Sequence, residues 1–243
     1  MVWKHGLRLP RNGWSGNKWL NSRDLRTREK TDEHIAHRFW NLAIRLHKLS
    51  PQYEFVERLR GQDPSATIVY RDLITDHIPY MNFRTMPGLH PSAVASDMLS
   101  EEERSTRSVT ERALSEFLSA DAIVLGVPMY NFGIPAQLKS WFDAILIPGR
   151  TFTYTSDGPK GLAGAKRVIL VITRGGFYGA TGVSSAMEHA ESYVRAALSL
   201  IGISGPELVL AEGIAMDRLA ALERGRTGIQ TLVPLSETSR STD

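Results

Sequence analysis

The sequence predicts an α/β domain of three layers, with helices on both faces of a parallel sheet. Helical and strand patterns alternate from residue 54 onward, as they do in parallel α/β folds. Residues 122–127 and 166–173 are almost continuously apolar, which is typical of strands that are covered on both faces. With 243 residues and 42% hydrophobic content, the chain can bury one sizeable core.

The first half of the domain contains a short strand, a long loop and two helices. Residues 67–70 predict the strand, and the prolines in residues 74–98 predict the loop. Ser100 and Glu103 predict a capping box for a helix that reaches Leu118 and leads into strand 122–127. The next helix begins at Pro135 and places its apolar face on the sheet.

The second half continues the alternation. After strand 166–173, Ser185 and Glu188 predict the cap of a long helix that closes at Gly202. Residues 207–211 form the last strand, and residues 217–233 a weaker helix that contains two glycines. Residues 236–243 are polar, and we expect a disordered tail.

The most informative segment is Gly-Val-Pro-Met-Tyr-Asn-Phe-Gly-Ile-Pro-Ala-Gln-Leu-Lys-Ser-Trp-Phe-Asp, residues 126–143. Its middle lies at the carboxyl end of a predicted strand, where the ligands of open α/β sheets bind. Met129, Tyr130 and Phe132 offer polarizable and aromatic surface, and a tight turn offers backbone N–H donors. This chemistry suits a flat, electron-accepting ring. Thr173-Arg-Gly-Gly176 follows the next strand, so we expect both loops to reach the same ring.

These residues resemble the Pro-Met-Tyr-Asn-Phe loop of the FMN-dependent NADH:azoreductase and quinone reductase family of flavodoxin-like proteins. Other segments resemble this family in the same order: its first helix (54–59), second strand (70–73), the segment after the flavin-loop helix (151–162), the second flavin loop (173–176) and the end of the last strand (211–215). The resemblance runs from about Glu54 to about Met216. It implies a flavodoxin-like three-layer sandwich.

By this resemblance, the activity is reduction of quinones and azo compounds by NADH through FMN, in a ping-pong cycle of two-electron transfers. The family works as a homodimer with the flavin near the interface. Whether this chain uses NADH or NADPH is left open. Because the cofactor carries the hydride, we assign no catalytic residue.

The resemblance also implies roles for individual residues. The expected contacts of the isoalloxazine are Met129, Tyr130, Asn131 and Phe132, and those of its polar edge are Thr173, Arg174, Gly175 and Gly176. Backbone donors or Arg174, aimed near N1 and the C2 carbonyl, would stabilise the negative charge of reduced flavin. The alternative for Arg174 is a surface salt bridge. Tyr154 matches a tyrosine on the substrate side of the flavin, and its alternative is simple packing.

The resemblance fails before residue 54. In the family, a Ser-rich loop after the first strand holds the FMN phosphate at a helix N-terminus. The corresponding residues 39–50 contain one serine and no glycine. Residues 42–46 alternate at period two, as a strand would, but a helical stripe also fits and is favoured, with apolar residues at Ile35, Phe39, Leu42, Leu46 and Leu49. We therefore expect the first strand and the phosphate loop to be replaced.

Two explanations compete for this departure. A frameshift or a misplaced start codon replaced the family's start and gave a damaged member, or the new segment supplies another strand and an anion site with Arg45 and Lys48. The first is favoured. It leads to an alternative function, a degenerate flavodoxin-like protein that cannot retain FMN and acts as a non-catalytic binding or inert dimer. The expected division is an atypical basic segment (1–53), an FMN-binding domain (54–235) and the tail (236–243).

Composition excludes several other classes. The absence of cysteine excludes disulfides, thiolate catalysis and cysteine-ligated metals, and suggests a cytoplasmic protein. No apolar stretch approaches the roughly 18 residues of a membrane span, and the first residues lack a signal-peptide core. Residues 1–60 hold 13 Lys and Arg against 6 Asp and Glu, but without a recognition motif we do not expect nucleic acid as a partner. His34, His37 and His47 have no matching carboxylates, so no metal site is predicted.

Overall fold

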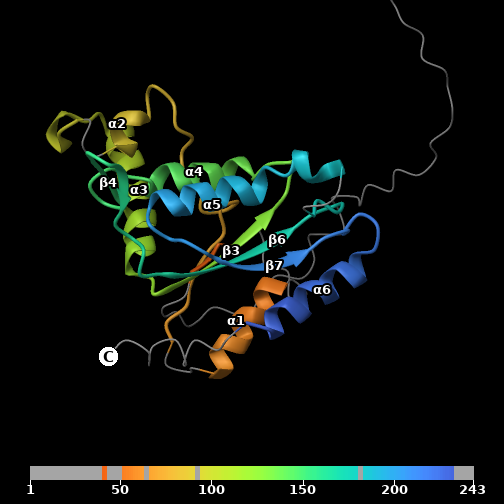
Figure 1. Cartoon of the computed structure of the whole chain (residues 1–243). Helices are drawn as coiled ribbons and strands as arrows, with labels where there is room; N and C mark the ends of the chain where they lie inside the picture. Colours follow the sequence, from red (N-terminus) through yellow and green to blue (C-terminus); the bar gives the residue numbers. More distant parts are fainter. Residues whose placement is uncertain (1–39, 43–50, 63–65, 91–93, 180–182, 233–243) are drawn as a thin grey trace, which may run out of the picture. The chain divides into compact units, whose positions relative to one another are not determined.

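The computed structural model describes residues 40–42, 51–62, 66–90, 94–179 and 183–232. The chain divides between His34 and Ile35 into two units, and every described residue lies in the second. This unit is built on a parallel sheet in the order β2-β1-β3-β6-β7, with helices on both faces (Figure 1). Its strands are β1 (Trp40–Leu42), β2 (Val69–Arg71), β3 (Ala122–Pro128), β6 (Arg167–Thr173) and β7 (Glu207–Ala211).

Helices cover the sheet from two sides (Figure 1). On one side lie α1 (Pro51–Gln62) and α6 (Arg218–Gln230). On the other lie α3 (Glu101–Ser119), α4 (Ala136–Ile145) and α5 (Ala190–Leu200). The flavodoxin-like three-layer fold class is therefore confirmed, because the strand order 2-1-3-4-5 of that fold is the order seen here.

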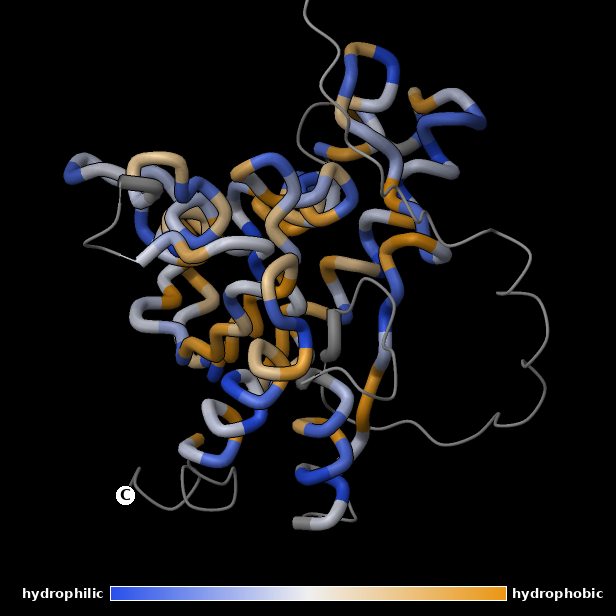
Figure 2. The backbone as a smooth tube through the Cα atoms, turned by 90° about the vertical axis from the view of Figure 1, so that its right-hand side faces the viewer, coloured by the Kyte–Doolittle hydropathy of each residue, from blue (hydrophilic) through white to orange (hydrophobic). Residues whose placement is uncertain are grey.

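The side chains of the central strands alternate between two cores. In β3, Ile123, Leu125 and Val127 join the core under α3, α4 and α5, whereas Ala122 and Val124 join the core under α1 and α6. Figure 2 shows the resulting concentration of apolar residues in the middle of the domain. This burial explains why the strand sequences are apolar on every residue instead of every second one.

The predicted start of α3 is confirmed. Ser100 Oγ accepts a hydrogen bond from Glu103 N at 3.3 Å, and the Glu103 carboxylate accepts one from Ser100 N at 2.7 Å. The hydrogen bonds from Ser100 hold the pKa of Glu103 below its usual range. Strands 122–127, 166–173 and 207–211 are likewise confirmed to within one residue.

The predicted cap of α5 is wrong. Ser185 lies in the 3-10 turn η2 (Val183–Met187), and α5 begins at Ala190 with His189 in the N-cap position. The Glu188 carboxylate accepts hydrogen bonds from the N–H groups of Ala190, Glu191 and Ser192, at 2.8–3.2 Å. Glu188 therefore satisfies the free amides of the first turn itself.

The helix favoured for residues 39–50 is also wrong where the structure describes it. Trp40–Leu42 form a strand that pairs in parallel with β2 on one side and with β3 on the other. A strand in this place supplies backbone partners to both neighbours, which explains why extended structure wins over the helical stripe. The segment that replaces the family's start thus supplies a strand of its own, as the second of the two explanations expects. Arg45 and Lys48, its proposed anion site, lie outside the described residues.

Two segments have more structure than the sequence suggested. The predicted long loop contains the short helix α2 (Met86–Leu89) and the 3-10 turn η1 (Ser96–Met98). Residues 151–162 contain an antiparallel hairpin of β4 (Phe152–Thr155) and β5 (Gly158–Gly161). Gly161 lies directly against Gly202, just after the end of α5.

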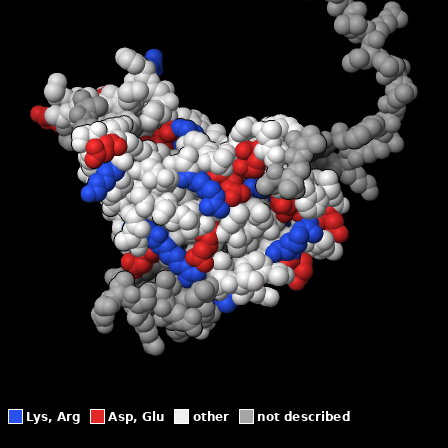
Figure 3. Space-filling model, in the orientation of Figure 1, with Lys and Arg blue, Asp and Glu red and all other residues white. Residues whose placement is uncertain are grey.

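The described surface shows mixed charge. On the face in Figure 3, positive and negative side chains alternate, and the described residues form no continuous basic stripe there. Within the described part of the chain, no helix is long and apolar enough to cross a membrane.

Candidate functional site

Two loops leave the sheet side by side at its carboxyl edge. β3 pairs with β6 along its whole length, up to Pro128 opposite Thr173. Met129 N then donates to Thr173 O at 2.8 Å, so the pairing continues into the loops. The predicted proximity of residues 129–132 and 173–176 follows from this register.

The first loop is a tight two-residue turn. Tyr130 N donates to Gly133 O at 2.9 Å, and Gly133 N donates to Tyr130 O at 3.1 Å. Between them, Asn131 and Phe132 have φ of 46° and 75°, the left-handed region that non-glycine residues rarely adopt. For a bulky residue such as Phe132, this backbone conformation stores strain on the order of 1 kcal/mol.

The turn leaves its central amides unused. Among the described residues, none accepts a hydrogen bond from the amides of Asn131 or Phe132. The Tyr130 and Phe132 side chains are 56% and 42% exposed. Strain, free donors and exposed aromatic surface thus coincide at one turn, a combination that suits recognition of a flat polar ring.

The second loop has glycines that the fold itself does not require. Gly175 and Gly176 have no positive φ, and a Cβ added at either would meet its nearest neighbour at 3.7 Å and 3.5 Å, an ordinary contact. Their amides also find no acceptor within the described part of the chain. Glycine without a conformational or packing need indicates close approach by another molecule.

Residues 213–215, which follow β7, donate backbone hydrogen bonds to the second loop. Ile214 N donates to Arg174 O, Ala215 N to Gly175 O and Gly213 N to Gly176 O, each at 3.1 Å. The carbonyls of this loop are therefore occupied by the protein. The amides of Gly175 and Gly176, which have no acceptor among the described residues, are the donors left for a ligand.

Comparison with known proteins identifies the family. The sequence model of the flavodoxin-like fold matches residues 49–232. A Methylobacterium radiotolerans protein named FMN-dependent NADH:quinone oxidoreductase is 50% identical over 160 residues, which cover 66% of this chain and 78% of that protein. The chain belongs to this flavodoxin-like family of quinone reductases and azoreductases.

Two further members support the assignment. A Methylorubrum extorquens protein of the same name is 44% identical over 173 residues, covering 71% of this chain and 83% of that protein. The crystal structure of an azoreductase from Bacillus anthracis superposes with a TM-score of 0.70 at 30% identity, covering 81% of this chain and 96% of that one. The family model begins at residue 49, consistent with the departure noted in the sequence before residue 54.

The Arg174 side chain lies beneath the surface of the second loop, among carboxylates. Its guanidinium is buried, with a 2% exposed side chain, and forms ion pairs with Glu191 at 2.7 Å, Glu212 at 3.0 Å and Glu188 at 3.3 Å. Because the guanidinium is buried, these pairs are not the surface salt bridge of the alternative. The predicted contact of Arg174 with the polar edge of the flavin stays a prediction. Only the backbone of Arg174 forms part of the second loop.

The three glutamates were not predicted as site residues. Glu188 was assigned only to a helix cap, and Glu191 and Glu212 are ordinary acidic residues in the sequence. The sequence offers only a weak signal for them. An arginine buried after a strand needs carboxylate partners, but the sequence does not show which carboxylates these are. Their positions depend on how α5 and β7 pack against β6.

Tyr154 lies on β4, in the separate hairpin. Its side chain is 72% exposed, and its ring packs edge-to-face on Phe152 with a centroid separation of 5.4 Å. This exposure leaves its ring available to a ligand or a second chain. Its predicted role on the substrate side stays a prediction.

A depression of about 730 Å³ lies beside the first loop, lined by Gly133, Ile134, Ala136, Lys139, His189, Ser192 and Tyr193. His189 N donates to Phe132 O at 2.9 Å, so the depression adjoins the strained turn. Burial, together with the Asp143 carboxylate, raises the pKa of Tyr193 to about 12, and its phenol stays protonated at neutral pH. No described group of three His, Asp or Glu residues could hold a metal, and His34, His37 and His47 lie outside the described residues.

Proposed function

We propose that this chain is an FMN-dependent oxidoreductase that uses NADH to reduce quinones and azo compounds. The observation that carries the proposal is the pairing of two loops at the carboxyl edge of β3 and β6, both with backbone amides that have no acceptor in the described parts of the chain. When bound there, FMN supplies two-electron transfer between the nicotinamide and the acceptor, in alternating half-reactions. The 50% identical relative carries the name of this activity.

The chain's own residues bind and orient the ring. Met129, Tyr130, Asn131 and Phe132 contact its surface and one edge, while Thr173, Gly175 and Gly176 offer backbone to the other. Because the turn at Asn131 and Phe132 is already in its strained conformation, its amides need little reorganisation to meet an acceptor. Arg174 acts from within the protein, and Tyr154 is exposed for contact with the acceptor.

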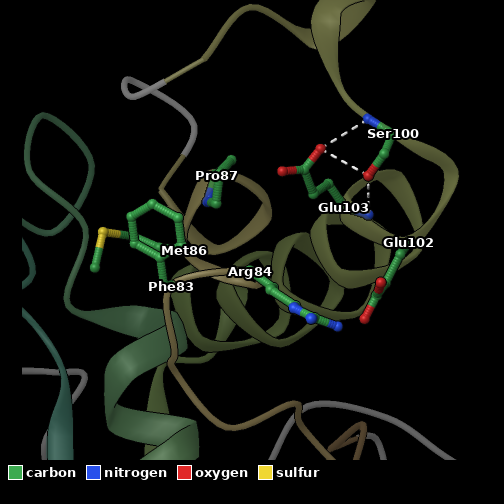
Figure 4. Close-up of a pocket in the computed structure, with 7 residues that line it drawn as sticks. All are labelled: Phe83, Arg84, Met86, Pro87, Ser100, Glu102 and Glu103. Carbon is green, nitrogen blue, oxygen red and sulfur yellow. Dashed lines mark hydrogen bonds between the residues drawn. The ribbon is translucent and has the colours of Figure 1, made fainter.

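A homodimer is part of this proposal. The segment between β2 and α3 carries several large apolar side chains on its surface, including Phe83 at 93% and Met98 at 76% exposure. Phe83 and Met86 line a groove of about 430 Å³ against the capped start of α3 (Figure 4). Such side chains are normally covered. A second copy is the proposed cover, and Phe83→Ser should lower the dimer fraction in sedimentation equilibrium, whereas an unchanged mass would rule out this surface.

The proposal is tested by titrating the full chain with FMN, following flavin fluorescence and the visible spectrum, and then adding NADH without oxygen. We expect saturable quenching of the flavin fluorescence, then bleaching of the visible flavin absorption by NADH, and recovery of colour on adding a quinone. Folded protein that neither quenches FMN nor bleaches with NADH would contradict the proposal. The compartment proposed for this reaction is the cytoplasm, in keeping with the absence of cysteine.

A second candidate is the degenerate protein that cannot retain FMN. It is favoured by one observation: the family match begins at residue 49, beyond the position of the family's phosphate loop. Parallel titrations with FMN and riboflavin separate the two candidates, because they differ only in the phosphate. Much tighter binding of FMN than of riboflavin would show a working phosphate site, which Arg45→Gln and Lys48→Gln would then locate. Equal, weak binding of both would support the degenerate protein.

A further inference from the structure

Arg174 lies where three separate elements meet. Its partners come from the residue before α5 (Glu188), from α5 itself (Glu191) and from the end of β7 (Glu212). Arg195 pairs with Glu191 at 2.8 Å from the solvent side, so two positive groups face three carboxylates. Of these five charged side chains, only that of Arg174 is almost fully buried.

The carboxylate of Glu212 closes the second loop at both ends. Its Oε1 accepts from Arg174 Nη1 at 3.0 Å and from Tyr178 N at 3.0 Å. A single oxygen therefore holds the first and last residues of the segment 174–178, with Gly175 and Gly176 between them. Removing the guanidinium frees one end of this closure.

The same cluster reaches the first loop by two routes. Tyr178 packs its ring edge-to-face on Phe132, with centroids 6.3 Å apart. Glu188 holds the start of α5, where His189 N donates to Phe132 O at 2.9 Å. Arg174 thus connects with the strained turn of the neighbouring loop through two intermediate residues on each route, Glu212 and Tyr178 on one and Glu188 and His189 on the other.

A buried ion cluster is a poor means of gaining stability, because desolvating the charges costs about as much as their attraction returns. The Nε of Arg174 also lacks a hydrogen-bond acceptor among the described residues. The fork geometry of a guanidinium, by contrast, fixes the relative positions of several carboxylates. The cluster is therefore suited to positioning more than to stabilising.

We infer that Arg174 is a positioning residue that sets the spacing between the two loops and, through it, the affinity for the flavin ring. The affinity part of this inference rests on the proposed function, whereas the spacing of the loops does not. Without Arg174, three partly buried carboxylates would repel one another beside the loops, and both segments would loosen together.

The chain contains a matched control at the opposite end of the same two strands. Arg167, the first residue of β6, forms a two-pronged pair with Glu207 of β7 at 2.5 Å and 2.8 Å. It lies seven residues from Arg174, roughly 23 Å along the strand. Arg167→Gln should therefore destabilise the β6–β7 pair without reaching either loop.

The test compares Arg174→Gln, Arg174→Lys and Arg167→Gln in the full chain by backbone hydrogen exchange and by FMN titration. In Arg174→Gln we expect the hydrogen-bonded amides of these two segments, those of residues 129, 130, 133, 174 and 178, to exchange at least tenfold faster and the FMN Kd to rise at least tenfold. For both quantities, Arg174→Lys should lie between the wild type and Arg174→Gln, because lysine keeps the positive charge but lacks the forked guanidinium. Arg167→Gln should change both quantities in these segments less than twofold.

Unchanged loop exchange and FMN affinity in Arg174→Gln would overturn the inference, as would equal effects from Arg167→Gln. If the wild-type chain does not bind FMN, the proposed function fails, and loop exchange alone decides the role of Arg174. If Arg174→Gln does not fold, Glu212→Gln replaces it, since it weakens the closure and keeps the side-chain shape. Normal loop exchange in that variant would equally overturn the inference.

Discussion

The glycines at the contact between β5 and the end of α5 differ in kind from those in the loop after β6. At Gly161, an added Cβ would lie 2.0 Å from the backbone nitrogen of Gly202, and Gly202 itself has a φ of +91°. At Gly175 and Gly176, ordinary space is free for a methyl group. The first pair is required by the protein's own packing. For the second pair, the proposed function supplies a reason that the protein's own packing does not, namely a flavin ring that approaches the backbone from outside.

Gly161→Ala should have the largest effect on this comparison. Its methyl group would collide with backbone atoms on Ile201 and Gly202, which cannot rotate away, and the free energy of unfolding should fall by about 3 kcal/mol. Urea unfolding measures the loss. Gly61→Ala in α1, where nothing lies within 4 Å, is the control and should be neutral or stabilising by under about 1 kcal/mol. Equal stability of the two variants would remove the distinction.

Gly175→Ala and Gly176→Ala should show the opposite profile. The free energy of unfolding should change by less than about 0.5 kcal/mol, as for surface substitutions outside special sites. FMN affinity should fall about tenfold, because a methyl group would stand where the ring edge meets the backbone. Fluorescence titration beside urea unfolding measures both quantities. Full FMN affinity in both variants would mean that these glycines do not face the ring.

The backbone strain at Phe132 should have a smaller and more specific effect. Phe132→Gly and Phe132→Ala both remove the ring, but only glycine adopts the φ of 75° without strain. Phe132→Gly should therefore be the more stable of the two by about 1 kcal/mol. This difference, from chemical unfolding, measures the strain that the turn holds before any ligand binds.

Phe177 provides the reference pair for this strain. It is an exposed aromatic residue in the neighbouring loop, and its φ is not positive. There, the order should reverse, with the alanine variant more stable than the glycine variant by roughly 0.5 kcal/mol. If the alanine variant is the more stable one at position 132 as well, the turn at Phe132 is unstrained in solution.

The success of sequence reasoning differed between the parts of the fold. The strands at 122–127, 166–173 and 207–211 were predictable because burial on both faces leaves a continuous apolar run in the sequence. The start of α3 was predictable because its cap lies within four residues. The start of α5 was not, because Ser185 and Glu188 offer an equally good local cap that the surrounding structure does not use.

The first strand shows the limit of local pattern. Residues 42–46 alternate as a strand would, but a helical stripe from Ile35 to Leu49 is favoured on pattern alone. Pairing with β2 and β3 on either side decides for strand at Trp40–Leu42. Such a gain is invisible in the sequence because the partners lie about 30 and 80 residues away.

For the candidate site, the sequence by itself determined which residues form the two loops, since each directly follows an apolar strand and carries its own recognisable residues. Only the tertiary structure decided the direction of the Arg174 side chain, which lies among Glu188, Glu191 and Glu212. The physical reason is that a loop's place depends on the strand before it, whereas a long charged side chain goes to the carboxylates that distant elements bring within its reach.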